Sequence, residues 1–113
     1  MDIEVFEERH GEVLVLVPVG RLDSDRAHAF ETLVMDRIRM RECHLVVDFS
    51  HLEFISSSGL RVLPLAAKAL KAANRSLVLC SMKEHIASVF QVSGFSQVIP
   101  VRPSREAAVA DAS

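Results

Sequence analysis

The sequence has no apolar run long enough to cross a bilayer. Its longest apolar stretches are strand-sized, such as VLVLVPV at residues 13–19, whereas a membrane-spanning helix needs about 20 apolar residues. The first residues, MDIEVFEERHGE, are acidic and lack the basic start and apolar stretch of a signal peptide. We therefore expect a soluble, cytoplasmic protein that inserts into no membrane.

The sequence also lacks a large excess of either charge. Thirteen Lys and Arg residues and 15 Asp and Glu residues give a formal net charge of −2. Because the two signs are interspersed, no long-range field arises that would recruit nucleic acid or an anionic membrane. We expect partners that are selected by shape, and no nucleic acid among them.

Cysteine is scarce, and metal-ligand patterns are absent. Cys43 and Cys80 match no metal spacing, and two cysteines in a core-forming chain behave as small hydrophobic residues of a reducing compartment. The five histidines form no HxxxH pair and no cluster with cysteine at zinc-ligand spacing. We expect neither a metal nor another cofactor.

The composition is that of one globular domain. The chain has 113 residues, of which half are hydrophobic and a quarter are charged, so it can form a core and remain soluble. No repeat, low-complexity tract or long linker divides it. We expect a single domain over residues 1–113, with the last few residues frayed.

Hydrophobic periodicity predicts an α/β fold with about five strands and four helices. Two β-rich runs at 3–8 and 12–19 predict a hairpin with the first strand at the edge of the sheet. Later strands are expected at 45–49, 76–80 and 97–101, and residues 50–55 are expected to form a loop. The run at 45–49 is nearly all apolar, which is typical of a central strand buried on both faces.

Four helices alternate with these strands, which implies a mixed, mostly parallel sheet with right-handed crossovers. Ser24 is the expected N-cap of the first helix. Ser81 and Glu84 have capping-box spacing at the third helix, and Gly94 is placed to end it. The expected helices span residues 24–40, 56–74, about 81–94 and 104–112.

Residues 48–60 are the first place to look for a site, because sites in parallel sheets form at the carboxyl ends of strands. GxGxxG, the P-loop and GxSxG are all absent there. Asp48 is placed like the phosphoacceptor of a response-regulator receiver, but the rest of that pattern is missing. His51 could act as a base for Ser57, although a loop histidine is more often a solvated surface group. We expect no enzyme.

Three serines precede Gly59 at the start of the second expected helix. Free backbone N–H groups and the helix dipole favour anions at such a position. The simpler alternative is that one serine is an N-cap and has no further chemistry. The residues themselves leave both interpretations open.

The segment LVVDFSHLEFISSSGLRVL, residues 45–63, resembles the STAS domains typified by bacterial anti-sigma factor antagonists. The family pattern is a strand that ends in Asp or Asn, a short loop, and then Asp-Ser-Ser-Gly-Leu at the start of a helix. GRLDSDRA at 20–27 and VFQVSGFSQVIPV at 89–101 are similar to two further family segments. The resemblance spans nearly the whole chain.

The resemblance implies a partner-switching protein whose phosphorylated residue is Ser57. In that family, the serine after the motif's Asp is phosphorylated by an anti-sigma factor that is also a serine kinase, and a PP2C-type phosphatase removes the phosphate. Here Ser56 stands where most phosphorylatable members have Asp.

The same resemblance implies a partner-binding surface around the motif and leaves an alternative. The implied partner-binding residues are Ser56, Ser57, Ser58, Gly59, Leu60 and Asp23. In the alternative, the chain is a STAS accessory subunit of a transport system, which docks a permanent partner at this surface and uses no phosphate.

Overall fold

The computed structural model describes residues 2–40 and 42–112. Within them, six strands form one sheet in the order β1-β2-β3-β5-β6, with β4 paired to the end of β2. The strands are β1 (Glu4–His10), β2 (Val13–Leu22), β3 (His44–Asp48), β4 (Leu52–Ile55), β5 (Leu77–Cys80) and β6 (Val101–Arg102). The helices are α1 (Ser24–Met40), α2 (Ser57–Ala72), α3 (Glu84–Ser93) and α4 (Arg105–Ala112), with a 3₁₀ turn, η1 (Phe95–Gln97), after α3.

The sheet is antiparallel at its first edge and parallel elsewhere. β1 and β2 form the expected hairpin, in which Glu4 pairs with Val19 and His10 with Val13. β2 is long enough to pair in parallel with β3 through its first residues and with β4 through its last ones. The predicted α/β class, with an N-terminal hairpin, a mostly parallel sheet and four helices, is therefore confirmed.

Two strands differ from the prediction. The expected loop at 50–55 contains β4, whose Leu52 and Ile55 are buried against the body of the protein. The strand expected at 97–101 is reduced to the two residues of β6, because Gly94 and η1 turn the chain first. Pro100 has no N–H to give to a neighbouring strand. Both differences arise in segments too short to show a period.

Helix termini also differ in part. α1 begins at Ser24, but Asp23 rather than Ser24 supplies the cap, since its Oδ1 accepts from the backbone N of Arg26 at 3.1 Å. The expected capping box at Ser81 does not form, because α3 begins at Glu84 with no side-chain cap. Gly94 ends α3 in the left-handed region, as predicted, with φ of 84°.

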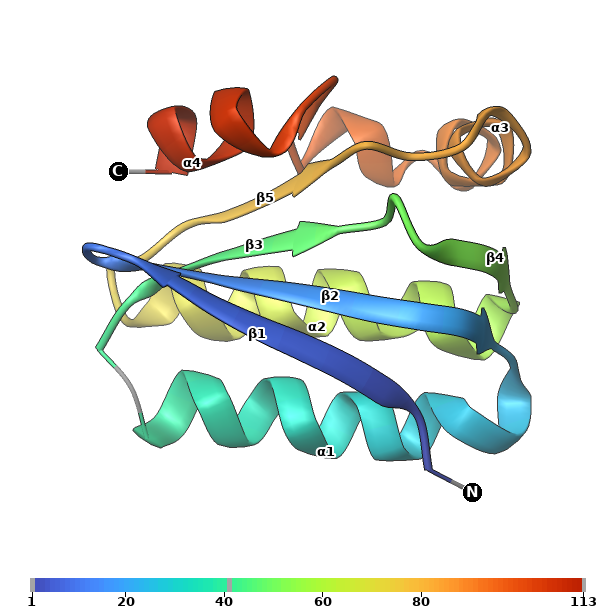
Figure 1. Cartoon of the computed structure of the whole chain (residues 1–113), viewed down its shortest axis with the longest axis horizontal. Helices are drawn as coiled ribbons and strands as arrows, with labels where there is room; N and C mark the ends of the chain where they lie inside the picture. Colours follow the sequence, from blue (N-terminus) through green and yellow to red (C-terminus); the bar gives the residue numbers. More distant parts are fainter. Residues whose placement is uncertain (1, 41, 113) are drawn as a thin grey trace.

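The sheet has helices on both faces (Figure 1). α1 and α2 bury Phe30, Val34 and Leu63 against one face. α4 covers the other face, where Ala108 and Ala112 join an apolar cluster of sheet residues, namely Val13, Val15, Val17, Val46, Val78 and Cys80. β3 is buried on both faces, as its sequence predicted.

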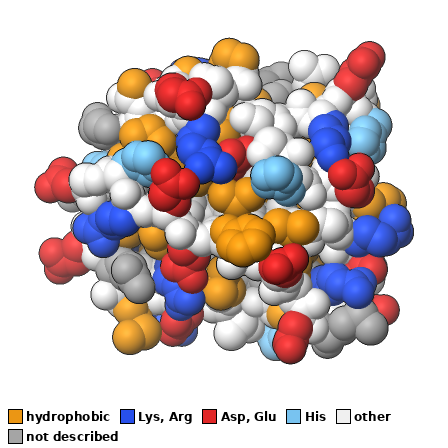
Figure 2. Space-filling model, viewed as in Figure 1, with side chains coloured by type: hydrophobic (Ala, Val, Ile, Leu, Met, Phe, Trp, Pro, Cys, Tyr) orange, Lys and Arg blue, Asp and Glu red, His pale blue; other side chains and the backbone are white. Residues whose placement is uncertain are grey.

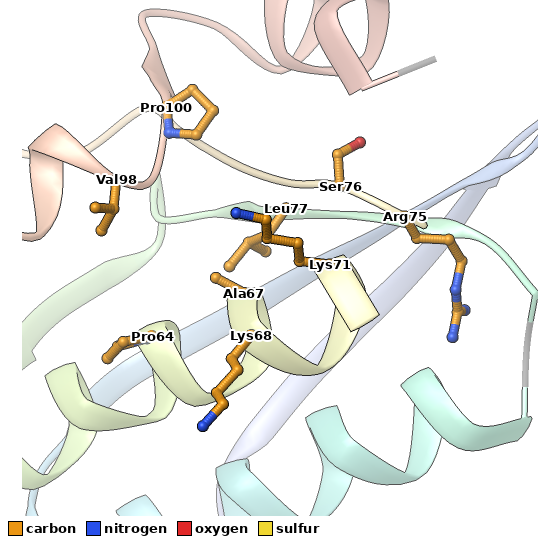
Figure 3. A pocket seen from close by; sticks show the side chains of 9 residues that line it. All are labelled: Pro64, Ala67, Lys68, Lys71, Arg75, Ser76, Leu77, Val98 and Pro100. Atoms are coloured by element: carbon orange, nitrogen blue, oxygen red, sulfur yellow. The ribbon is translucent and has the colours of Figure 1, made fainter. Parts of the chain in front are cut away.

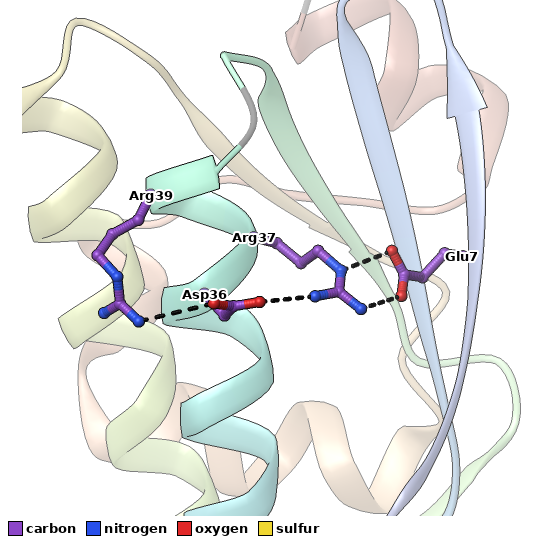
Figure 4. A network of polar contacts seen from close by, with 4 residues as sticks. All are labelled: Glu7, Asp36, Arg37 and Arg39. Atoms are coloured by element: carbon purple, nitrogen blue, oxygen red, sulfur yellow. Dashed lines mark hydrogen bonds and ion pairs between the residues drawn. The ribbon is translucent and has the colours of Figure 1, made fainter.

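Ion pairs attach the edge strand to this framework. Arg37 of α1 donates from Nε and Nη2 to both carboxylate oxygens of Glu7 on β1, at 2.9 and 2.8 Å. Asp36 accepts a third bond from Arg37 at 3.0 Å and also pairs with Arg39 (Figure 4). Bidentate contacts of this kind fix orientation as well as position. The chain of contacts therefore holds β1 over α1.

Candidate functional site

The three serines have different positions at the start of α2. Ser56 is the N-cap, with φ of −87° and ψ of 169°, and its side-chain oxygen accepts from the backbone N of Gly59 at 3.1 Å. Ser57 is the first helical residue and is exposed. Ser58 is half-buried and borders a hollow of about 330 Å³ between α1 and α2. Of the three serines, Ser57 is the exposed one.

Gly59 allows α2 to approach β2 and β4 closely. A Cβ atom built on Gly59 would lie 2.9 Å from the carbonyl oxygen of Leu22 and 3.1 Å from Cγ1 of Ile55. The backbone N of Ser56 also donates to the Leu22 carbonyl, at 2.9 Å. The glycine of the motif is therefore needed for packing, and it fixes where the serines emerge.

Asp23 lies next to this contact because it directly follows Leu22. Its carboxylate caps α1 and pairs with Arg26 at 2.7 Å, and it is half-buried. The structure thus brings together the six residues expected at the partner surface, but they differ in access. Ser56, Ser57, Ser58 and Asp23 reach the surface, whereas Gly59 and Leu60 are buried and hold the helix in place.

Sequence reasoning missed an aromatic and cationic pair beside the serines. The guanidinium of Arg21 lies 4.3 Å from the ring centroid of Phe54, a cation–π contact, and Phe54 is 37% exposed. Arg21 and Phe54 are partners in the parallel register of β2 and β4. The pairing depends on that register, so no local sequence signal could have revealed it.

β4 is also connected to the start of α3. Lys83 forms an ion pair with the carboxylate of Glu53. Nε2 of His85 lies 2.7 Å from the backbone oxygen of Glu53. These contacts hold β4 against the start of α3. The end of β2, the end of β4 and the start of α2 are adjacent, since Leu22 pairs with Ile55 and Ser56 bonds to Leu22, and Arg21, Phe54 and Ser57 are exposed there.

Asp48, the last residue of β3, has a structural role. It is only 2% exposed, and it accepts hydrogen bonds from the backbone N of Ser50 at 2.9 Å and from Nε of Arg105 at 2.8 Å. Burial opposes ionisation, but the bonds from Ser50 and Arg105 outweigh it and hold the pKa of Asp48 below its usual value. Arg105 reaches Glu8 as well, at 2.6 Å. Asp48 therefore anchors α4 to the sheet.

Histidine and acidic side chains are not gathered around Ser57 in the described part of the chain. No cluster of three or more His, Cys, Asp or Glu side chains occurs within residues 2–40 and 42–112. Among these residues, no hydrogen bond joins the side chain of His51 to Ser57, and His51 is exposed. No helix in the described part of the chain is long and apolar enough to span a membrane.

Charges of both signs occur on one face of the protein (Figure 2). On the face seen in Figure 2, acidic and basic side chains alternate around a small apolar area. This face shows no broad region of one sign, in agreement with the near-neutral composition.

The sheet order, the hairpin and the serine turn at the start of α2 are those of one class of regulatory binding domain. The chain belongs to the STAS domain family, whose model matches residues 6–108, and it is of the anti-sigma factor antagonist type. Proteins of the anti-sigma factor antagonist type are not enzymes.

Individual relatives agree with this classification. The chain is 40% identical over 98 residues to BtrV of Bordetella bronchiseptica, which is named a putative anti-sigma factor antagonist; the match covers 87% of this chain and 84% of BtrV.

Two solved structures show the same fold. The crystal structure of an anti-sigma factor antagonist from Mycobacterium paratuberculosis superposes with a TM-score of 0.89 at 23% identity, covering 97% of this chain and 93% of that one. The Bacillus cell fate determinant SpoIIAA in its phosphorylated form superposes with a TM-score of 0.74 at 21% identity, covering 96% and 98%.

Proposed function

We propose that this protein is a cytoplasmic anti-sigma factor antagonist. In its unmodified form it binds an anti-sigma factor and thereby releases whatever that partner sequesters. The 40% identity to BtrV over most of both chains is the main support for this proposal. The surface of β2, β4 and α2 is the proposed contact. Ser57 is exposed on it, Ser56, Ser58 and Asp23 are half-buried at it, and Gly59 and Leu60 lie beneath.

Ser57 is the proposed switch residue, and one observation carries this assignment. Because Ser56 supplies the cap of α2, the exposed hydroxyl of Ser57 is not needed to stabilise the helix. A serine kinase, which is the anti-sigma factor itself, can then modify Ser57, and a PP2C-type phosphatase can restore it. That SpoIIAA, a protein of the same fold, exists in a phosphorylated form is in keeping with this assignment.

Phosphorylation would act on the contact rather than on the fold. A phosphoryl group adds roughly −1.5 to −2 charges and a bulky, hydrated group to the surface. The helix N-terminus offsets about 0.3–1 kcal/mol of the local cost, so the domain remains folded. The complex with the partner weakens because the contact surface now carries charge and volume that the partner does not accommodate.

Ser56 in place of the usual Asp fits the same scheme. Its hydroxyl makes the cap bond to Gly59 that a carboxylate would make. A neutral cap avoids a second negative charge beside a phosphate on Ser57. The substitution therefore preserves the helix start while it changes the local charge.

The binding function is tested with an anti-sigma factor encoded beside the gene. Calorimetric titration should show that wild type and Ser57→Ala bind this factor and that Ser57→Glu binds it more weakly. Ala110→Glu is the matched charge control, because Ala110 is exposed on α4, which covers the face of the sheet opposite to α2. Equal affinity of Ser57→Glu and wild type would contradict the switch and favour a permanent docking subunit of a transport system.

A further inference from the structure

The basic side chains of α2 differ from the other basic side chains of the protein. In the described part of the chain, the side chains of Arg61, Lys68 and Lys71 take part in no ion pair, hydrogen bond or ring contact. Every other described Lys or Arg has such a partner. α2 itself carries no Asp or Glu. Its exposed side therefore presents cations without counter-charges.

Two of these cations lie beside an apolar slot. The slot has a volume of about 430 Å³ and lies between the second half of α2 and the chain around β5 and β6. Its apolar lining consists of Pro64, Ala67, Leu77, Val98 and Pro100. Val98 is 73% exposed, so one wall is an apolar side chain left in water.

The orientation of the basic side chains determines which of them can contact an anion bound in this slot. Lys71 lies across the opening in front of Leu77, whereas Lys68 extends from the adjacent turn away from the floor (Figure 3). Arg75 points away from the slot and donates to the backbone oxygens of Ile38 and Cys43, at 2.7 and 3.1 Å. Among the described residues that line the slot there is no Asp or Glu. Lys71 and, after a rotamer change, Lys68 can therefore meet an anion at the rim.

We propose that this slot binds a small anionic amphiphile, namely an apolar chain or ring that carries a carboxylate. The apolar body would cover Leu77 and Val98, and the carboxylate would pair with Lys71 and Lys68 at the rim. The volume is at the lower end of that of small-molecule sites, about 300–1,000 Å³, which suits a ligand of medium chain length. Charge complementarity selects an anion over a neutral or cationic analogue.

This site is separate from the serine turn. Pro64, the lining residue nearest to Ser57 along α2, is two helical turns further on, about 10 Å along the axis. The proposal therefore does not rest on phosphorylation or on an anti-sigma factor partner. Occupancy of the slot is measured without either.

The test is a titration of the full ¹⁵N-labelled chain with octanoate below its micelle concentration, followed by NMR. We expect saturable shifts centred on the amides of Ala67, Lys71, Leu77 and Val98. The neutral analogue 1-octanol, which has the same number of carbons, should bind more weakly. Replacing both lysines, Lys68→Gln with Lys71→Gln, should weaken octanoate binding about fivefold, since two exposed charge pairs are lost.

A matched pair of variants tests the position of the ligand. Val98→Glu adds a negative charge to the wall of the slot and should weaken octanoate binding, whereas Val92→Glu makes the same change on α3, away from the slot. Circular dichroism verifies that both variants are folded. Absence of saturable shifts, shifts centred elsewhere, equal binding of octanol, or equal effects of the two variants would each overturn the proposal.

Discussion

The side-chain oxygen of Ser56 accepts a hydrogen bond from the backbone N of Gly59 at 3.1 Å. This bond satisfies one of the free backbone donors at the start of α2. The neighbouring Ser57 is exposed and does not act as the helix cap. The cap of α2 therefore depends on Ser56, and the proposed switch residue is its neighbour Ser57.

The first prediction follows from this division. Ser56→Ala removes the cap and should lower the free energy of unfolding by about 0.5–2 kcal/mol, whereas Ser57→Ala should change it by less than about 0.5 kcal/mol. Ser56→Asp should retain most of the stability because a carboxylate can accept the same bond. Urea denaturation measures all three variants. A larger loss for Ser57→Ala than for Ser56→Ala would mean that the cap is assigned to the wrong serine.

The second prediction concerns the close packing at Gly59. In Gly59→Ala the new Cβ would lie 2.9 Å from the Leu22 oxygen, so the helix must shift. We expect a destabilisation of about 1–3 kcal/mol, although alanine is the better helix former. Ser58→Ala, at the neighbouring position, is the control. If thermal unfolding shows that Gly59→Ala is as stable as wild type, the glycine is not required for this approach.

The third prediction is a pH dependence that arises from Asp48 and Arg105. The pKa of Asp48 is lower in the folded state than its ordinary value of 3.8. Its ionised form therefore stabilises the fold above that pH, and this contribution is lost as the pH falls through the folded-state pKa. Arg105→Gln should lower the free energy of unfolding by about 1–3 kcal/mol at pH 7.

The difference between Arg105→Gln and wild type should shrink in acid, because Asp48 becomes protonated in both. Arg102→Gln is the matched control, since the ion pair of Arg102 with Asp111 is half-exposed and should contribute no more than about 0.5 kcal/mol. Denaturant titrations at a series of pH values give the comparison. A difference independent of pH would exclude the Asp48 carboxylate as its origin.

The fourth prediction concerns the exposed ring beside the serines. Phe54→Ala should leave the fold stable and weaken binding of the anti-sigma factor by at least about 1 kcal/mol, because exposed aromatic and Arg side chains are frequent hot spots of interfaces. Phe6→Ala is the control: Phe6 is 58% exposed on β1, on a different edge of the sheet. Equal effects of the two substitutions on affinity would place the contact elsewhere.

The longer elements could be predicted from the sequence because each repeats its own period. Helix α1 has the predicted bounds, residues 24–40, and β3 is buried on both faces as its apolar run indicated. The four residues of β4 were not predicted, and the last strand was predicted at 97–101 but is only Val101–Arg102. Such short segments form strands only where a neighbouring strand is already placed.

The candidate site was predictable where it is local and unpredictable where it depends on the fold. The order of the serines and Gly59 is a local pattern, and the family resemblance selects Ser57 within it. The contact of Arg21 with Phe54 requires the register of β2 and β4. The slot at Lys71 and Val98 likewise requires α2 and the end of η1 to meet, and no spacing in the sequence encodes that meeting.

The measurement that tests the account most directly is peptide mass spectrometry of the wild-type chain after incubation with the co-encoded serine kinase and ATP. We expect a single phosphate on Ser57, none on Ser56 or Ser58, and no incorporation into Ser57→Ala. The modified chain should stay folded, and a PP2C-type phosphatase should remove the phosphate. Phosphate on Ser56 or Ser58, or no phosphate on the wild-type chain, would contradict the assignment of Ser57 as the switch.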